Sequence, residues 1–242
     1  MESLIERLPN VEALVERAQT ITLELIQTAI TQRGQFTIAL AGGSTPKPLY
    51  EHLATQSLPW DKIHVFWGDE RYVPPTHPDS NERMARQAWL DHVPIPPENI
   101  HRMPTESPNP ADSAQAYEQH LRTFFGDAEI PSFDLILLGI GDDGHTASLF
   151  PHTAVLNVCD RWVDVGYRGI DPRITLTIPL LNQARHILFM VAGASKETAL
   201  AAIFADNTNP FDYPARFIRP VGQLQWLIDQ AAGQNLNLSV GP

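Results

Sequence analysis

A histidine and two carboxylates lie in a glycine-rich segment that directly follows an apolar run. Residues 139–151 read Gly-Ile-Gly-Asp-Asp-Gly-His-Thr-Ala-Ser-Leu-Phe-Pro, and residues 133–138 before them have the composition of a buried strand. α/β enzymes hold their reactive groups just beyond the carboxyl ends of such strands. The adjacent carboxylates, Asp142 and Asp143, can orient an imidazole, whose ordinary pKa of about 6.5 suits proton transfer near neutrality. We therefore predict that His145 is a catalytic base.

A second segment combines glycines, hydroxyls and a lysine at a point where a strand is expected to lead into a helix. It spans residues 40–48 and reads Leu-Ala-Gly-Gly-Ser-Thr-Pro-Lys-Pro. Free backbone amides at a helix start, the helix dipole and Lys47 in the first turn favour an anion, most naturally a phosphate. The Gly-Lys-Ser/Thr of a Walker A loop is absent. An ordinary turn capped by Ser44 or Thr45 is the alternative.

A third segment places an acid and an arginine after another strand-like run, residues 63–67. Asp69 can accept hydrogen bonds from sugar hydroxyls, and the forked donors of Arg71 can clamp a phosphate or polarise a carbonyl. A surface ion pair within this segment is the simpler alternative. Residues 79–81, Asp-Ser-Asn, are expected to cap a helix whose pattern covers residues 83–93.

Two more cations occupy expected strand ends. Arg173 opens the segment 173–178, and Lys196 lies in a glycine-containing loop after another apolar run. If the segment 173–178 runs antiparallel to the main sheet, Arg173 lies at the same edge as the carboxyl ends of the parallel strands. Both cations would then face Lys47 and Arg71 across one crevice. An acidic protein gains little from gathering positive charge unless an anion binds there.

The elements that position these residues alternate between helix and strand along the chain. A helix is expected over residues 11–30, with Gly34 as its C-cap. Buried strands are expected at four apolar runs, each followed by a glycine-containing loop: residues 36–40, 63–67, 133–140 and 186–192. This order predicts a doubly wound, mainly parallel sheet with helices on both faces, in a single α/β domain over residues 1–242.

Several segments fall outside this alternation. Residues 161–165 and 173–178 lie too close together for a helical crossover, so we expect antiparallel or edge strands. The proline-rich residues 94–110 are expected to form an ordered surface loop inside the domain. The first residues are expected to lead straight into an amphipathic helix, and a last helix is expected over residues 222–232. We expect Cys159 to be a buried apolar thiol.

Composition narrows the possible partners. The chain has 242 residues, of which 43% are hydrophobic, and a formal net charge of −11, which disfavours nucleic acid and anionic membranes as partners. No apolar stretch approaches the roughly 18 residues of a membrane span. The sequence lacks a metal-binding His or Cys pattern and a serine-hydrolase elbow. We expect a cytoplasmic protein that acts on a small molecule, without metal, cofactor, nucleic acid, membrane or obligate protein partner.

Five motifs occur in a fixed order along nearly the whole chain. They are Ala-Gly-Gly-Ser-Thr-Pro at 41–46, Gly-Asp-Glu-Arg at 68–71 with His-Pro-Asp-Ser-Asn at 77–81, the glycine-rich segment 139–151, and Arg-Ile-Thr-Leu-Thr at 173–177. Together they resemble the 6-phosphogluconolactonase family. The resemblance implies a modified Rossmann-like α/β domain that hydrolyses 6-phospho-D-glucono-1,5-lactone to 6-phosphogluconate in the oxidative pentose phosphate pathway.

The resemblance also implies roles for individual residues. His145 would be the general base that activates water, with Asp143 nearby to orient it. Asp69 and Arg71 would contact the lactone end of the substrate. The sugar phosphate would be bound by Gly42, Gly43, Ser44, Arg173 and Lys196, to which the interpretation of the glycine loop itself adds Thr45 and Lys47.

The wider superfamily includes glucosamine-6-phosphate deaminases, which have a similar glycine loop and Asp-Gly-His segment. Deaminases continue that segment into Phe-Asn-Glu, whose glutamate assists ring opening, whereas residues 148–150 here are Ser-Leu-Phe. Phe150 in place of that acid favours the lactonase. A deaminase, or a sugar-phosphate sensor that uses no base, is the alternative. The donor to the developing oxyanion stays open between Arg71 and backbone amides near Gly141 or Gly144.

Overall fold

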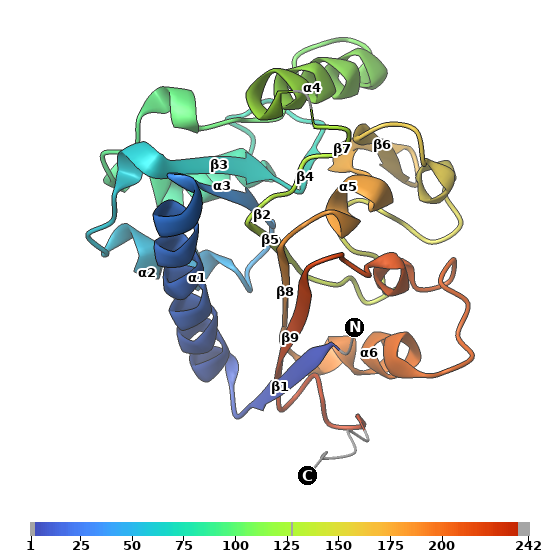
Figure 1. The fold of residues 1–242 in the computed structure, drawn as a ribbon. Helices are drawn as coiled ribbons and strands as arrows, with labels where there is room; N and C mark the ends of the chain where they lie inside the picture. The colour runs from blue at the N-terminus through green and yellow to red at the C-terminus, as the bar shows by residue number, and fades with distance from the viewer. Residues whose placement is uncertain (1–2, 127, 237–242) are drawn as a thin grey trace.

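The fold is built on a six-stranded sheet in which each pair of neighbouring strands is parallel. The computed structural model describes residues 3–126 and 128–236, and the strand order is β1-β9-β8-β5-β2-β3 (Figure 1). The four expected buried strands and the mainly parallel, doubly wound sheet are confirmed. The strands are β1 Leu4–Leu8, β2 Phe36–Leu40, β3 Ile63–Trp67, β5 Leu135–Leu138, β8 His186–Val191 and β9 Gln223–Asp229.

Helices cover both faces of this sheet. α1, Val11–Arg33, lies on one face beside α2, Lys47–Ala54, and α6, Glu197–Phe204, lies on the other (Figure 1). The Asn10 side chain caps the start of α1 by accepting a backbone hydrogen bond at 2.9 Å, and Gly34 ends it with a φ of 81°, as predicted. Within the described ranges, no helix combines the length and apolar character needed to cross a membrane. The fold also contains α3 Asn81–Ala88, α4 Pro110–Phe125 and α5 Ile178–Asn182.

A second sheet of three strands is antiparallel, in the order β4-β7-β6. Its strands are β4 Asp69–Arg71, β7 Asp171–Leu176 and β6 Val163–Arg168. β4 follows β3 after the single residue Gly68, whose amide donates to the Leu40 carbonyl on β2 and whose carbonyl accepts from the β7 amide of Leu176, both at 2.9 Å. The two segments predicted as antiparallel or edge strands are therefore confirmed as antiparallel, and they form a sheet of their own.

Two expectations for the chain ends are wrong. Residues 222–232 contain β9 instead of a helix. This strand lies between β1 and β8 and is buried from Gln225 onward. Its apolar residues Leu224, Trp226, Leu227 and Ile228 have a spacing that fits a helix as well as a buried strand. The first residues form the edge strand β1, which pairs with β9, and the helix begins after it at Val11, the start predicted for the long helix.

Other expectations have mixed outcomes. Cys159 is exposed, so the prediction of a buried thiol is wrong. The cap predicted at residues 79–81 is confirmed, because Ser80 Oγ accepts the Arg83 amide at 3.1 Å, although α3 ends at Ala88, before the predicted boundary. Residues 94–110 are ordered as predicted, but the segment is not wholly on the surface, since five of its residues are buried: Ile95, Asn99, His101, Met103 and Thr105.

The outer edge of β3 is covered by this segment and by α4. Ile100 forms an isolated parallel bridge to Val65, and the His101 amide donates to the Val65 carbonyl at 2.8 Å. Three histidines are linked through their ring nitrogens: His64 on β3, His101 in the segment before α4, and His120 on α4. The distance from His64 Nδ1 to His101 Nε2 is 3.1 Å, and that from His101 Nδ1 to His120 Nε2 is 2.7 Å. We call these three residues the histidine row.

Candidate active site

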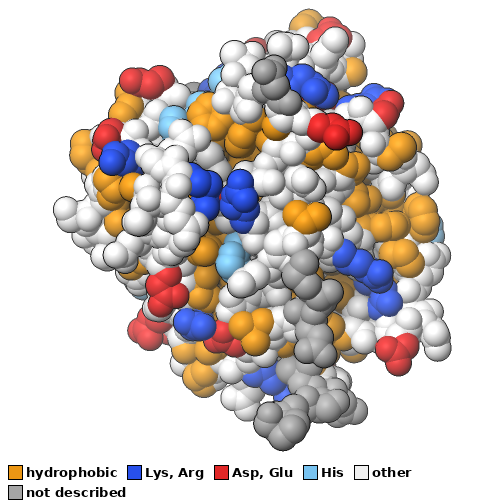
Figure 2. All heavy atoms as spheres, in the orientation of Figure 1, with side chains coloured by type: hydrophobic (Ala, Val, Ile, Leu, Met, Phe, Trp, Pro, Cys, Tyr) orange, Lys and Arg blue, Asp and Glu red, His pale blue; other side chains and the backbone are white. Residues whose placement is uncertain are grey.

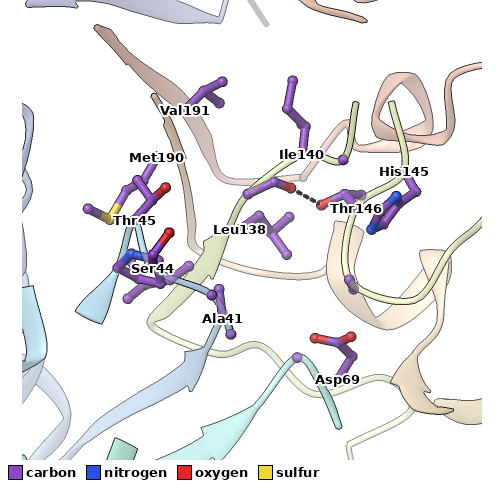
Figure 3. A pocket seen from close by; sticks show the side chains of 18 of the residues that line it. Ala41, Ser44, Thr45, Asp69, Leu138, Ile140, His145, Thr146, Met190 and Val191 are labelled. Carbon is purple, nitrogen blue, oxygen red and sulfur yellow. Dashed lines mark hydrogen bonds between the residues drawn. The ribbon is translucent and has the colours of Figure 1, made fainter. Parts of the chain in front are cut away.

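A cavity of about 430 Å³ opens at the carboxyl ends of β2, β3, β5 and β8. Its walls are the loops that follow these strands, together with β4 and β7 of the second sheet. Figure 3 shows Ser44 and Thr45 on one side of the cavity, His145 on the opposite side, and the Asp69 carboxylate below them in the view. The carboxyl edge of a parallel sheet is where α/β proteins bind ligands, and this volume suits a ligand the size of a hexose phosphate.

The imidazole of His145 lies in the cavity wall and is held by Asp143. His145 Nδ1 is 2.5 Å from Asp143 Oδ1, which also accepts the His145 amide at 3.1 Å. The hydrogen bond from His145 lowers the pKa of Asp143 to about 2, so the carboxylate is charged at neutral pH. Because a carboxylate can only accept, Nδ1 carries the ring proton and the lone pair is on Nε2. The pair therefore fixes an imidazole with its acceptor nitrogen turned away from Asp143.

Gly141 makes room for this pair. A Cβ at residue 141 would lie 2.0 Å from His145 Nδ1 and 2.6 Å from Asp143 Oδ1, which no side chain could tolerate without displacing both groups. The Gly141 amide also donates to the His145 carbonyl at 2.8 Å and closes the loop. One glycine of the motif thus reflects a close approach of the backbone to the imidazole and its carboxylate.

Two arginines form a cationic wall on the second sheet. Arg71 on β4 and Arg173 on β7 are direct partners in the antiparallel register, where like charges repel, and both line the cavity. Burial lowers the pKa of Arg173, and the charge of Arg71 acts in the same direction. Arg71 Nη1 donates to the Asp79 carbonyl at 2.6 Å, whereas its buried Nε lacks a hydrogen-bond partner within the described residues. An anionic ligand would relieve the repulsion.

Phe150 separates the imidazole from one of these arginines. Its ring centroid lies 4.5 Å from that of His145, and the Arg173 guanidinium carbon lies 5.4 Å from the centroid of the same ring. The Phe150 side chain is buried. An apolar ring therefore lies between the imidazole and the guanidinium, and residue 150 supplies no carboxylate to the site.

Asp69 faces the cavity from a buried position. Its Oδ2 accepts a hydrogen bond from Ser148 Oγ at 2.6 Å, and its backbone carbonyl accepts one from Asn81 Nδ2 at 2.8 Å. The neighbouring Glu70 is also buried and accepts the amides of Asn81 and Glu82 at 2.7 Å each, which fastens the start of α3 to β4. The segment is therefore not a surface ion pair. Asn81 lines the cavity, a placement that its sequence role as part of a helix cap did not reveal.

The glycine loop, residues 42–46, lines the cavity and leads into α2. Gly42 packs closely on Asn81, since an added Cβ would lie 1.9 Å from Asn81 Oδ1. Tyr50 fixes the residue before the loop: its hydroxyl donates to the Ala41 carbonyl at 2.8 Å and accepts the Ala41 amide at 3.1 Å. One tyrosine thus holds the residue before the loop by two hydrogen bonds, and one asparagine packs on its first glycine.

The start of α2 differs from expectation in two respects. The N-cap residue is Pro46, and no side-chain cap hydrogen bond is made, so the alternative in which Ser44 or Thr45 caps this helix is wrong. Lys47 is not among the residues that line the cavity. Its Nζ lies 3.5 Å from Glu51 Oε1, its neighbour one turn along the helix surface. The predicted convergence of Lys47 with the other cations is therefore wrong.

Lys196 reaches the cavity from the loop after β8, where it is paired with a carboxylate. Its Nζ is 2.6 Å from Asp142 Oδ1, and the Ser195 hydroxyl donates to the same oxygen at 3.1 Å. The hydrogen bond from Lys196 is the main cause of a lowered pKa for Asp142. Asp142 thus turns toward the β8 loop, and the prediction that both carboxylates orient His145 holds for Asp143 but not for Asp142.

Most of the predicted site residues lie together. Asp143 stands directly behind His145, and the others line the cavity: Gly42, Gly43, Ser44, Thr45, Asp69, Arg71, His145, Arg173 and Lys196. The amides of Gly141 and Gly144 donate to carbonyls within their own loop, at 2.8 and 3.0 Å, whereas Arg71 Nε has no hydrogen-bond partner within the described residues. The sequence did not reveal that Asn81 and Ser195 line the cavity, or that Asp142 pairs with Lys196. No local motif signals any of these placements.

The surface view supports a cationic site on an acidic protein. Figure 2 shows Lys and Arg side chains next to a histidine near the centre of one face, while Asp and Glu side chains lie mostly toward its periphery. Local charge opposite in sign to the net charge of −11 favours an anionic ligand. Over the described part of the chain, no three His, Cys, Asp or Glu side chains come close enough to hold a metal ion.

Residues 9–226 match the model of the family described as glucosamine-6-phosphate isomerases/6-phosphogluconolactonase. The chain belongs to this family. A 6-phosphogluconolactonase of Synechocystis sp. is 60% identical over 238 residues, which cover 98% of this chain and 99% of the relative. One of Nostoc sp. is 59% identical over 240 residues, which cover 98% of this chain and 100% of the relative. The family resemblance expected from the motifs is thereby confirmed.

Solved structures of family members have the same fold. The 6-phosphogluconolactonase from Trypanosoma cruzi is 30% identical with a TM-score of 0.87, and the match covers 98% of each chain. The enzyme of the same name from Trypanosoma brucei is 31% identical with a TM-score of 0.86, covering 97% of this chain and 99% of its own. The predicted Rossmann-like α/β class is confirmed.

Proposed function

We propose that this protein hydrolyses 6-phospho-D-glucono-1,5-lactone to 6-phosphogluconate, with His145 as the general base. The observation that carries the proposal is the His145–Asp143 pair, set in the wall of a cavity that also receives Arg71, Arg173 and Lys196. Family membership, and the identity of 59–60% to relatives named 6-phosphogluconolactonase, support the lactone as the substrate.

In the proposed reaction, Nε2 of His145 takes a proton from water as the water oxygen attacks the lactone carbonyl carbon. The tetrahedral intermediate then breaks its bond to the ring oxygen, and the imidazolium returns the proton to that oxygen, which becomes a hydroxyl. One water is consumed, and the acid that forms ionises at neutral pH. A lactone is already an activated ester, so the reaction needs neither a covalent nucleophile nor a metal. General-base assistance contributes about 10²–10⁴-fold.

Binding of the sugar phosphate positions the carbonyl for this attack. We assign the phosphate to the glycine loop, residues 42–45, together with Arg173 and Lys196, and the lactone end to Asp69 and Arg71. The buried Arg71 Nε, which lacks a partner within the described residues, supports Arg71 as donor to the developing oxyanion. A phosphate held away from the reacting carbon contributes binding energy that fixes the carbonyl against the imidazole. Lys47 has no part in the proposal, because it pairs with Glu51.

The test is acid release from 6-phosphogluconolactone, measured above the spontaneous background. The protein should accelerate release, and His145→Ala should lose about 10²–10⁴-fold of that acceleration while still binding 6-phosphogluconate in calorimetry. His52→Ala is the matched control, because His52 is an exposed histidine on α2 away from the cavity. An alanine variant at residue 145 with full activity would remove the imidazole from the mechanism.

The same preparations separate the lactonase from its alternatives. Release of ammonia from glucosamine-6-phosphate would identify a deaminase, an outcome that the apolar Phe150 beside the imidazole opposes. Saturable binding of 6-phosphogluconate with no turnover, unchanged by His145→Gln, would identify a sensor.

A further inference from the structure

The carboxylate of Asp142 occupies a place at which a bound anion is expected. β5 and β8 are paired strands, so the loops that follow them lie side by side. Asp142 comes from the loop after β5, and Ser195 and Lys196 come from the loop after β8. Two donors, the Lys196 ammonium and the Ser195 hydroxyl, converge on the single oxygen Oδ1. All three residues line the cavity.

The ion pair between Asp142 and Lys196 can be replaced by another contact at little cost in stability. The Asp142 side chain is 68% exposed and that of Lys196 is 24% exposed. An ion pair this open to water contributes little to stability, so holding the fold together is a poor explanation for it. Its clear effect is on the cavity, where it neutralises Lys196, while Arg71 and Arg173 are register partners on β4 and β7 and both line the same cavity.

We infer that Asp142 is an internal substitute for the phosphate of the ligand: it binds Lys196 and Ser195 and must be displaced when a phosphosugar enters. The inference rests on the proposed function for the identity of that ligand. Asp142 is a positioning residue for Lys196, since it is placed to compete with the phosphate and not to contact the reacting carbonyl.

The competition weakens the binding of every ligand whose phosphate uses Lys196, product included. Asp142→Asn removes the competing charge and also the repulsion between the displaced carboxylate and a phosphate dianion. Both effects act in the same direction, and for a pair of this exposure they amount to about fivefold tighter binding. The chemical step at His145 is untouched, so KM should fall while kcat stays within about twofold.

The experiment titrates inorganic phosphate and 6-phosphogluconate into the full-length protein by calorimetry at low ionic strength. Asp142→Asn should bind both about fivefold more tightly than the parent protein. Glu197→Gln is the matched control, because it removes the same charge directly beside Lys196 without altering the Asp142–Lys196 pair, and its affinity should match that of the parent. Equal or weaker binding by Asp142→Asn, or an equal gain in Glu197→Gln, would overturn the inference.

A second parent protein, the variant Lys196→Met, tests whether Asp142 acts through Lys196. In Lys196→Met, the further change Asp142→Asn should give no gain in phosphate affinity, because the competed cation is gone. If Asp142→Asn still raises phosphate affinity about fivefold in the Lys196→Met protein, Asp142 acts by its charge alone and not through Lys196, which would contradict the inference. Asp142→Ser serves as a second variant, and circular dichroism checks the fold of each.

Inorganic phosphate keeps this test separate from the proposed function. If Asp142→Asn binds phosphate more tightly but the protein does not hydrolyse the lactone, the role of Asp142 is supported and the lactonase function is rejected. If the protein hydrolyses the lactone but Asp142→Asn binds phosphate no more tightly than the parent protein, the lactonase function is supported and the role of Asp142 is rejected.

Discussion

Acid should destabilise this protein through the histidine row before ordinary carboxylates begin to titrate. Burial lowers the pKa of His64, His101 and His120, and it lowers that of His101 to about 3, with the two neighbouring imidazoles acting in the same direction. His101 also stacks on Phe66, with ring centroids 4.2 Å apart. The native row thus excludes protons that the same imidazoles bind in the unfolded chain below about pH 6.5.

The loss of stability has a defined pH window. Above about pH 6.5 His101 is neutral in both states and its full contribution is present. As the pH falls toward about 3, the unfolded chain binds a proton that the native state refuses, and the free energy of unfolding falls by about 1.4 kcal/mol per pH unit. At about pH 5 this gives about 2 kcal/mol for His101. Water that reaches the row beside the more exposed His64 and His120 screens part of it, so we expect a loss of about 1–2 kcal/mol.

The assay is urea unfolding followed by tryptophan fluorescence at several values from about pH 7.5 to about pH 5. His101→Phe keeps the stack on Phe66 and removes the central imidazole. This variant should be less stable at the higher pH, because His64 and His120 each lose a partner, but its stability should fall less steeply on acidification. His52→Gln, at an exposed position of α2, should keep the parent slope. The reasoning is refuted if the parent protein is equally stable at both ends of the range, or if His101→Phe keeps the full slope.

Two further changes test the loops of the site. Gly141→Ala should reduce kcat for the lactone about 100-fold or more with an unchanged circular dichroism spectrum, because its Cβ pushes His145 and Asp143 apart; a parent-like kcat would show that the pair is dispensable. Glu70→Gln should lower the free energy of unfolding by about 1–3 kcal/mol in urea, since an amide nitrogen would face backbone amides that the carboxylate now accepts. The exposed Glu98→Gln is its control, and equal stability of the two variants would contradict this role.

The parts of the site that could be predicted are those set by short stretches of sequence or by strand direction. His145 and Asp143 share one tight loop, so their contact follows from the motif itself. Arg71 and Arg173 are far apart in sequence, and they meet because β4 and β7 pair as antiparallel strands. The short connection between β6 and β7 indicated that these two strands are antiparallel, but the pairing of β7 with β4 was not predicted.

The parts that could not be predicted depend on choices between equally plausible partners. Lys47 is near the cavity in sequence, but Glu51 one helical turn away captures its ammonium. Asp142 has a neighbouring histidine in its own loop and a lysine in the next loop, and only the three-dimensional placement of the β8 loop decides between them. For β9, the apolar residues Leu224, Trp226, Leu227 and Ile228 have a spacing that fits one face of a helix as well as a buried strand, so periodicity offers no distinction.

The junction at Gly68 has a consequence for how ligand preference can change. The imidazole is carried by a loop of the six-stranded sheet and the two guanidinium groups by the three-stranded sheet, and this glycine is hydrogen-bonded to both. A small rotation at that joint would alter the span between base and arginines while leaving each loop internally intact. Substitutions around residue 68 therefore offer a way to adjust the length of molecule that is accepted without redesigning the proton-transfer pair.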